Sequence, residues 1–314
     1  MPEKTSDIWW LFSRQTVSIT TQESVLKSAL LMKNRNFRHL PVIAESGKIL
    51  GILSAQDIID TLDLTIHSSP TAEDVKTALE IPVERVMTGQ PIVVEPGDGL
   101  REVIKKLCYH NVGALPVVNM LGVVEGIITL RDLVSLIGTS SSPLNVEVSE
   151  IMNPNVTTIS PDSSLAESVS LMSERRVRRL PVLDDGDKVM GMLTNKDVLR
   201  HIAKIVNGGS GPSGFERRVS EFMATGVINI SHEDDVRVAA NQMATFGVGG
   251  LVVEDLPSHK IGLITERDLI RTLSSKRGVD FLMGSMQYEL ETDDAMSRLN
   301  SFSSPARLTG HGAK

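Results

Sequence analysis

One heptapeptide pattern occurs four times in this chain: a glycine, two apolar residues, a hydroxyl residue, two variable residues and an aspartate. The four copies are residues 51–57, 126–132, 191–197 and 262–268. Ten residues before each glycine the chain has a proline, or a valine in the fourth copy, namely Pro41, Pro116, Pro181 and Val252. Because one register covers all four copies, the pattern predicts a repeat architecture in which one small supersecondary unit recurs.

The residues before each copy predict the rest of the unit. Short alternating runs indicate a first strand, centred on Ile19, Val94, Ile159 and Ile230. Apolar residues in steps of four and three then indicate one buried helix face; they are Val25, Ala29 and Met32, Leu100, Ile104 and Leu107, Leu165, Val169 and Met172, and Val236, Ala240 and Met243. Two strands joined by a turn and a short second helix complete a strand-helix-strand-strand-helix unit. Such a small sheet cannot bury both faces alone, so we expect an α+β fold in which units pair through their sheets.

The segments between the units differ. Each unit is preceded by a short segment, called the lead-in here, which ends at Phe12, Met87, Met152 or Met223 and which we expect to pack onto the previous unit. A charged, helical insert is expected at 60–80, and a flexible link at 207–214. We place a boundary between two halves at Ser142-Pro143. Beyond Leu273 we expect a helix at 280–299 and a disordered tail at 300–314.

Composition limits the classes of protein to which the chain can belong. A length of 314 residues with 41% apolar residues suits about two globular domains. A single cysteine, Cys108, excludes an internal disulfide framework, and no signal peptide or apolar run of about 20 residues is visible, so we expect a soluble cytoplasmic protein. A net charge of −7 and 4% aromatic residues disfavour a broad nucleic-acid-binding surface.

The four copies resemble the domains called CBS, after cystathionine beta-synthase, over about residues 5–275. The resemblance implies two Bateman modules, in each of which two repeats pack sheet to sheet about a pseudo-twofold axis, as in the gamma subunit of AMP-activated protein kinase. The first module would be 1–142, with repeats at about 8–65 and 83–140. The second would be 143–275, with repeats at about 148–206 and 219–275, followed by the segment 276–314. In this family the clefts between paired repeats bind AMP, ADP, ATP or S-adenosylmethionine.

The hydroxyl residue and the aspartate three positions later have two interpretations. At a strand-to-helix junction they form a helix N-cap with an acid in the first turn. By resemblance, the aspartates would also hold the ribose of an adenine nucleotide; these are Asp57, Asp132, Asp197 and Asp268. The hydroxyl and phosphate ligands beside them would be Ser54, Thr129, Arg131, Thr194, Lys196, Thr265 and Arg267. Gln56 replaces the basic residue in the first copy, which predicts poor phosphate binding there.

The residues three and two before the proline position divide the copies into basic and small ones. The basic pairs are Arg38-His39 and Arg178-Arg179, and the small pairs are Gly113-Ala114 and Gly249-Gly250. The basic residues could be a solvated helix end, or they could reach the phosphate of a nucleotide held by the partner repeat. In the second interpretation the adenine pocket consists of Val94, Val112, Gly113, Ala114, Ile230, Val248, Gly249 and Gly250. Arg178 and Arg179 would then serve the Asp268 site, and Arg38 with His39 the Asp132 site, where protonation of His39 would strengthen binding in mild acid.

The sequence contains no recognisable catalytic or metal-binding constellation, because its seven histidines are scattered and no nucleophile stands in a known motif. We therefore expect a non-enzymatic regulator that binds an adenine nucleotide and acts on an unidentified partner protein, without a membrane. Two other classes stay open: a nucleic-acid-binding or interaction scaffold, and a structural module with empty clefts. An S-adenosylmethionine sensor is the alternative ligand assignment. By resemblance, modules stack into flat discs of two modules from one chain or of four from two chains, the latter a homodimer. Trp9 and Trp10 would lie either in a contact between modules or chains, or within their own module.

Overall fold

The computed structural model describes residues 8, 11–14, 16–64, 70–140, 143–208, 213–254 and 261–273. The first repeat contains β1 (Ile19–Thr20), α1 (Val25–Arg35), β2 (His39–Ile43), β3 (Ile49–Ser54) and α2 (Ala55–Asp63), followed by α3 (Ala72–Leu79). The second contains η1 (Val83–Arg85), β4 (Thr88–Gly89), α4 (Leu100–Tyr109), β5 (Ala114–Val118), β6 (Val124–Thr129) and α5 (Leu130–Thr139). The third contains α6 (Val148–Ile151), α7 (Leu165–Glu174), β7 (Arg179–Leu183), β8 (Val189–Thr194) and α8 (Asn195–Gly208). The fourth contains η2 (Val219–Glu221), β9 (Asn229–Ser231), α9 (Val236–Phe246), β10 (Gly250–Glu254), β11 (Gly262–Thr265) and α10 (Glu266–Leu273).

Each repeat builds a small mixed sheet, as predicted. An antiparallel hairpin places the proline opposite the first apolar residue of the heptapeptide, for example Pro41 opposite Ile52. The four predicted first-strand residues all pair in parallel with the hairpin: Ile19 with Val42, Val94 with Val117, Ile159 with Val182, and Ile230 with Val253. In the second and third repeats this pairing is a single bridge rather than a strand.

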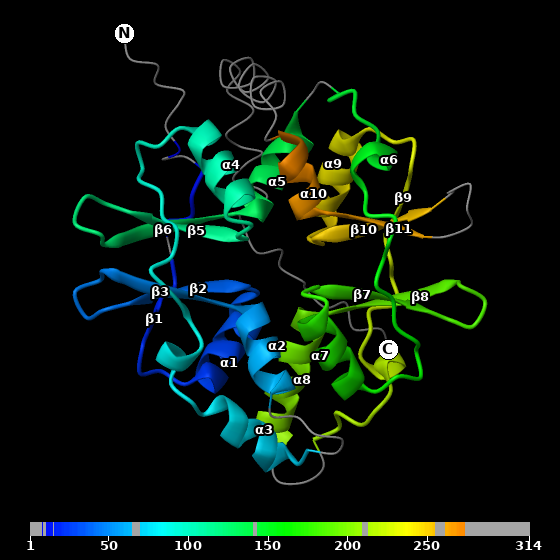
Figure 1. The fold of residues 1–314 in the computed structure, drawn as a ribbon, viewed down its shortest axis with the longest axis horizontal. Helices are drawn as coiled ribbons and strands as arrows, with labels where there is room; N and C mark the ends of the chain where they lie inside the picture. Colours follow the sequence, from blue (N-terminus) through cyan, green and yellow to red (C-terminus); the bar gives the residue numbers. More distant parts are fainter. Residues whose placement is uncertain are drawn as a thin grey trace, which may run out of the picture.

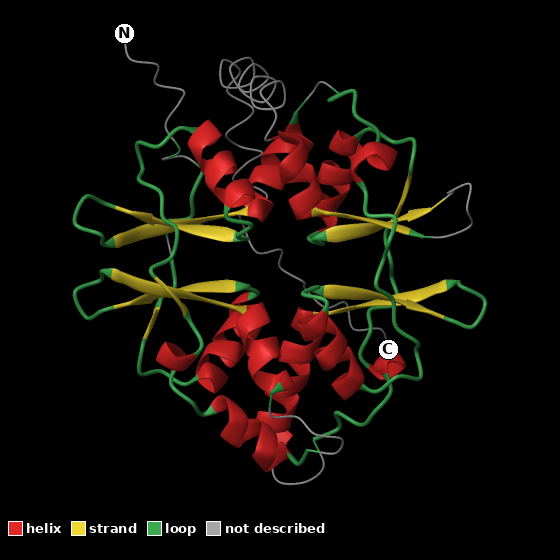
Figure 2. Cartoon of the chain, viewed as in Figure 1, coloured by secondary structure: helices red, strands yellow, loops and turns green. Residues whose placement is uncertain are grey.

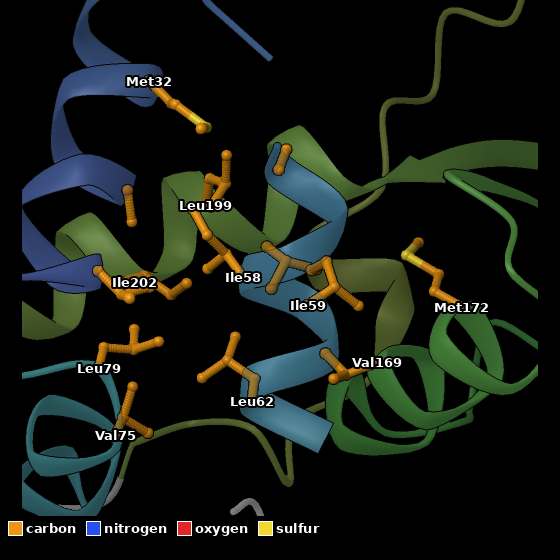
Figure 3. Close-up of a cluster of buried hydrophobic side chains, with 14 of the residues drawn as sticks. Met32, Ile58, Ile59, Leu62, Val75, Leu79, Val169, Met172, Leu199 and Ile202 are labelled. Atoms are coloured by element: carbon orange, nitrogen blue, oxygen red, sulfur yellow. The ribbon is translucent and has the colours of Figure 1, made fainter. Parts of the chain in front are cut away.

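The predicted helix faces are confirmed, because every residue of the four expected triplets is buried. The helices do not make four separate cores, however. One hydrophobic core joins the first and third repeats, and Figure 3 shows Ile58 and Leu62 of α2 beside Leu199 of α8 and Val169 of α7. A second core joins the second and fourth repeats, where α5 packs on α9. A Cβ at Gly138 of α5 would lie 2.9 Å from the Asn241 Cα, so only glycine permits this close helix crossing.

The glycine that opens each heptapeptide has a packing role. A Cβ on Gly51 would lie 2.6 Å from the Met87 Sδ, and one on Gly191 would lie 2.5 Å from the Met223 Sδ. A Cβ on Gly126 would overlap the ring of Phe12. The lead-in of the second repeat therefore packs on the first, and the lead-in of the first repeat packs on the second. The expectation that each lead-in packs on the previous unit is confirmed for Met87 and Met223, whereas Phe12 packs on the unit that follows it.

The sheets form two layers in the middle of the molecule, and helices cover their outer faces (Figures 1 and 2). Main-chain hydrogen bonds link the first two hairpins: the N–H of Ile49 donates to the carbonyl of Gly122 at 3.0 Å, and that of Val124 to Gly47 at 3.1 Å. The hairpin turns lie at the outer edges, so the first residues of β2, β5, β7 and β10 and the last of β3, β6, β8 and β11 lie toward the centre (Figure 1). No helix in the described ranges is long and apolar enough to cross a membrane.

Several expectations fall outside the residues that the structure describes. These are the contact of Trp9 and Trp10, the helix at 280–299, the tail at 300–314 and residues 209–212 of the link at 207–214. The insert at 60–80 contains α3, in agreement with its predicted helix. The boundary at 142–143 stays a prediction, and both hydrophobic cores draw residues from each side of it.

Candidate ligand site where the four repeats meet

The strand register places each basic or small pair beside the hydroxyl residue of the same repeat. Ala114 pairs with Thr129 and Gly250 pairs with Thr265 across the even hairpins. His39 pairs with Ser54, and Arg179 with Thr194, across the odd ones. The basic or small pair and the hydroxyl residue of the heptapeptide are about 15 residues apart in each repeat. The strand pairing therefore makes them neighbours at the centre of the molecule.

All four aspartates act as helix caps. Oδ2 of Asp132 accepts hydrogen bonds from the N–H and the Oγ1 of Thr129, both at 2.7 Å. Asp268 accepts the same pair of bonds from Thr265, at 2.9 and 2.6 Å. In each case Oδ1 accepts no hydrogen bond from the described residues, so one carboxylate oxygen remains for a further donor. Asp197 differs, because its Oδ1 accepts a hydrogen bond from Arg200 at 2.5 Å.

The basic pairs of the odd repeats face the small pairs of the even repeats, and their two members point to different halves of the chain. The second member stays in its own half: a Cβ at Gly113 would lie 2.9 Å from the His39 Nε2, and one at Gly250 would lie 2.5 Å from the Arg179 Nη1. The first member crosses to the other half. Arg178 Nη1 would lie 3.0 Å from the same Gly113 Cβ, and Arg38 Nη1 3.0 Å from a Cβ at Gly249.

This alternation corrects the expectation that each basic pair serves only its own half. Successive residues at the start of a strand point to opposite sides, and at a junction of four repeats those sides face different partners. Each small pair therefore receives one basic side chain from its own half and one from the other half. We call the two positions the Gly113 site, beside Thr129 and Asp132, and the Gly249 site, beside Thr265 and Asp268.

The basic residue before the aspartate also reaches across the junction. Lys196 Nζ donates to Asn36 Oδ1 at 2.7 Å, Arg131 Nη2 to the Gly247 carbonyl at 3.1 Å, and Arg267 Nη1 to the Asn111 carbonyl at 2.6 Å. The three acceptor residues all have positive φ values of 53 to 66°. In this arrangement Arg131, Lys196 and Arg267 join repeats of different halves. Gln56, which lacks the charge, donates instead to Asp60 of its own helix at 3.0 Å.

Glu266 was missed by the sequence reasoning. Its carboxylate accepts from Arg38 Nη2 at 2.9 and 2.7 Å and lies 3.3 Å from Arg131 Nε, with 5% of its side chain exposed. A signal for it exists in the repeat: the matching residues are Ala55, Leu130 and Asn195, all of which are buried. A glutamate at a position that the other copies keep uncharged indicates a buried carboxylate with a dedicated partner.

Burial and crowding shift the pKa values of the junction. Burial raises the pKa of Glu266, but Arg38, Arg131 and Arg179 outweigh it and hold that pKa at about 2. Burial lowers the pKa of Arg178 to about 10, and neighbouring arginines add to the effect. Burial, then Arg178 and Arg38, hold the pKa of His39 well below 6.5, so His39 stays neutral in mild acid. The expected strengthening of binding through His39 in mild acid is therefore corrected.

The apolar residues assigned to an adenine pocket lie in two environments. Val94 and Ile230 are buried in the core of the second and fourth repeats. Val112 and Val248 are partly buried and pack against that core next to the small pairs.

Burial raises the pKa of the Asp132 carboxyl, and the hydrogen bonds from Thr129 oppose this shift. Asp57 has a raised pKa for the same reason, and its N-cap partner is Ser54.

The fold and the junction define a protein of tandem α+β repeats whose strand ends meet at one shared, largely cationic centre. The chain belongs to the CBS-domain family, whose model, described as "CBS domain", matches residues 6–64, 83–139, 148–204 and 219–275. An uncharacterised 33.4 kDa protein in a ribosomal RNA operon of Thermofilum pendens is 31% identical over 274 residues, which cover 84% of this chain and 90% of the relative.

Two solved structures share the arrangement of the four repeats. Protein MJ1225 of Methanocaldococcus jannaschii, proposed in its structure report as an archaeal homologue of gamma-AMPK, superposes with a TM-score of 0.71 at 23% identity. That match covers 85% of this chain and 99% of MJ1225. An uncharacterised conserved protein from Pyrococcus horikoshii superposes with a TM-score of 0.58 at 22% identity, with the same coverage. At these identities the likeness shows the fold.

Proposed function

We propose that this chain is a non-catalytic regulatory protein that binds adenine nucleotides at the Gly113 and Gly249 sites and passes the bound state to a partner protein. One observation carries the proposal: basic side chains of the odd repeats converge on small residues of the even repeats, beside Thr-Asp pairs that keep one carboxylate oxygen for a donor. A ribose has two vicinal hydroxyls that can donate hydrogen bonds to such an oxygen. A phosphate needs the charge-assisted donors that the guanidinium groups provide.

The positions of the arginines favour a small anion over a polymer. Arg178 and Arg179 point into the junction, whereas the neighbouring Arg175 and Arg176 are exposed at the end of α7. A buried cationic centre admits one phosphate group but not the backbone of a nucleic acid, which needs an exposed basic stripe. The arrangement thus supports the nucleotide interpretation over the scaffold interpretation.

The contacts that join the two halves support transmission of the bound state to a partner. Arg38 of the first half bonds Glu266 of the second, and Arg131 bonds Gly247. A phosphate that draws these arginines toward itself changes how residues 1–142 and 143–275 are held together. A ligand can shift such an arrangement only through its different affinity for the two states.

Thermal unfolding of the full chain tests the proposal. AMP, ADP or ATP at 100 times its dissociation constant should add about 2.7 kcal/mol to the free energy of unfolding and raise the melting temperature. S-adenosylmethionine, which carries no phosphate, and adenosine are the comparison ligands. If millimolar AMP, ADP and ATP all leave the melting temperature unchanged, the nucleotide function is wrong. A larger shift with S-adenosylmethionine than with any nucleotide would assign the site to that ligand instead.

A further inference from the structure

The Gly113 and Gly249 sites occupy matching positions in the repeat, yet their charges differ. Arg178 and His39 provide the three atoms nearest to a Cβ at Gly113, and no carboxylate oxygen is among these three. Arg179 and Arg38 face Gly249, and Glu266 shares the space with them: a Cβ there would lie 3.0 Å from the Glu266 Oε2. The Gly249 site therefore contains an anion from the protein itself, whereas at the Gly113 site the charge of Glu266 acts on Arg178 and His39 from a greater distance.

Glu266 is not required by the local structure in which it lies. The helix begins at the fifth residue of the heptapeptide, which is Ala55, Leu130 or Asn195 in the other repeats, and all three helices form. The cap of α10 is provided by Thr265 and Asp268, as in the other copies. A buried carboxylate costs desolvation energy that well-packed neutral residues avoid. Its presence at one of four equivalent positions therefore indicates a role at the junction rather than in the helix.

The partners of Glu266 are the groups that a phosphate would need. Its two oxygens receive Arg38 Nη2 from the first repeat and Arg131 Nε from the second. Its charge also acts on Arg179 of the third. One carboxylate from the fourth repeat thus engages basic residues of the other three, as a ligand phosphate at the Gly249 site would do.

We propose that Glu266 is a resident anion that takes the phosphate position of the Gly249 site and directs phosphate-bearing ligands to the Gly113 site. The inference rests on the proposed function for the identity of the natural ligand, but its central claim concerns any phosphate group. An incoming phosphate at the Gly249 site meets a fixed negative charge and arginines that are already paired. At the Gly113 site it meets Arg178, which forms no ion pair with a carboxylate of the described residues. The two sites therefore differ in their preference for charge, although their Thr-Asp pairs are alike.

Isothermal titration calorimetry on the full chain tests this assignment, with inorganic pyrophosphate, AMP and adenosine as probes. The unmodified protein should bind one pyrophosphate tightly per chain. Glu266→Gln preserves the size of the side chain and removes its charge, so a second site should appear whose affinity is at least about tenfold higher than in the parent. Adenosine, which has no phosphate, should bind both proteins equally.

Two further variants separate the effect from folding and from net charge. Glu266→Asn copies the residue that the third repeat has at this position, Asn195, and should also open the second site. Glu221→Gln removes the same charge from an exposed ion pair with Arg217 and should leave pyrophosphate binding unchanged. Near-ultraviolet circular dichroism shows which variants are folded. An unchanged number of sites and unchanged affinities in both folded Glu266 variants would overturn the proposal.

The outcomes also separate this inference from the proposed function. If AMP binds neither protein but pyrophosphate gains a site in Glu266→Gln, the nucleotide function is wrong and the resident anion stands. If AMP binds the unmodified protein and the Glu266 variants behave like the parent, the nucleotide function stands and the resident anion is wrong.

Discussion

The Gly113 and Gly249 sites form a comparison within one molecule. Both have a Thr-Asp cap, a small pair and two basic side chains, one from each half of the chain. They differ in three substitutions at matching positions: His39 against Arg179, Ala114 against Gly250, and Leu130 against Glu266. Only the last introduces a negative charge. The repeated backbone thus fixes where a ligand would lie in both sites. In the Gly249 site a single side chain, Glu266 at the start of α10, determines whether a negatively charged ligand is accepted.

The largest expected difference between the sites comes from Arg178. Within the part of the chain that the structure describes, Arg178 faces the Gly113 site and pairs with no carboxylate. Arg178→Gln should therefore weaken AMP binding about 10- to 150-fold, the value of a hydrogen bond to a charged group. Arg179→Gln should have a smaller effect, since Arg179 faces the site that Glu266 already occupies. Calorimetry with AMP and adenosine measures both.

Arg175→Gln is the matched control for Arg178→Gln, because Arg175 is an exposed arginine at the end of α7, three residues before Arg178. It should bind AMP like the unmodified chain. Equal losses for AMP and adenosine in Arg178→Gln would mean that this side chain supports the fold instead of the phosphate. A larger loss in Arg179→Gln would reverse the ranking of the two sites.

A smaller difference is expected among the aspartates. Asp132→Asn should weaken AMP binding by about tenfold, because a charged acceptor for the ribose becomes a neutral amide. Asp197→Asn should change it by less than about twofold, since Oδ1 of Asp197 is already engaged by Arg200. The 2'-deoxy form of AMP should lose affinity for the unmodified protein but not for Asp132→Asn. Identical affinities of both nucleotides for the unmodified protein would leave these aspartates as helix caps alone.

The smallest expected effect is a pH dependence from Lys196. Burial, then Arg131 and Arg38, lower its pKa to about 8, and a bound phosphate would raise it again. The complex then holds more protons than the free protein, so AMP binding should strengthen about threefold from pH 9 to pH 7. For the free protein the sign is opposite: its stability should rise with pH between about 8 and the ordinary lysine value.

Lys196→Arg keeps the positive charge throughout this range and should abolish the pH dependence of AMP binding. Titrations at pH 7, 8 and 9 in buffers of matched ionic strength measure it. A slope that survives in Lys196→Arg would place the titrating group elsewhere in the junction.

Much of the fold could be predicted because its signals are local. The buried helix faces, the hairpins and the Thr-Asp caps each depend on residues within one repeat, and four copies make each signal unambiguous. The approach of the basic pairs to the small pairs could also be predicted, from their alternation between copies. The crossing of Arg38 and Arg178 to the other half could not, because it depends on how the two halves face each other. Glu266 is visible in the sequence as a charged residue at a position that is uncharged in the other copies. Its role could not be predicted, because its partners lie in the other three repeats.

The reciprocal packing of the lead-ins bears on how the protein is made. Phe12 covers Gly126, which follows it by more than a hundred residues. At a synthesis rate of about 5–20 residues per second, the ribosome delivers that partner roughly 5–20 s after Phe12. During this interval the nascent first unit exposes an apolar segment that its own residues cannot cover. The first half should therefore resist proteases only after β6 has left the exit tunnel, so that its two repeats are completed together rather than one after the other.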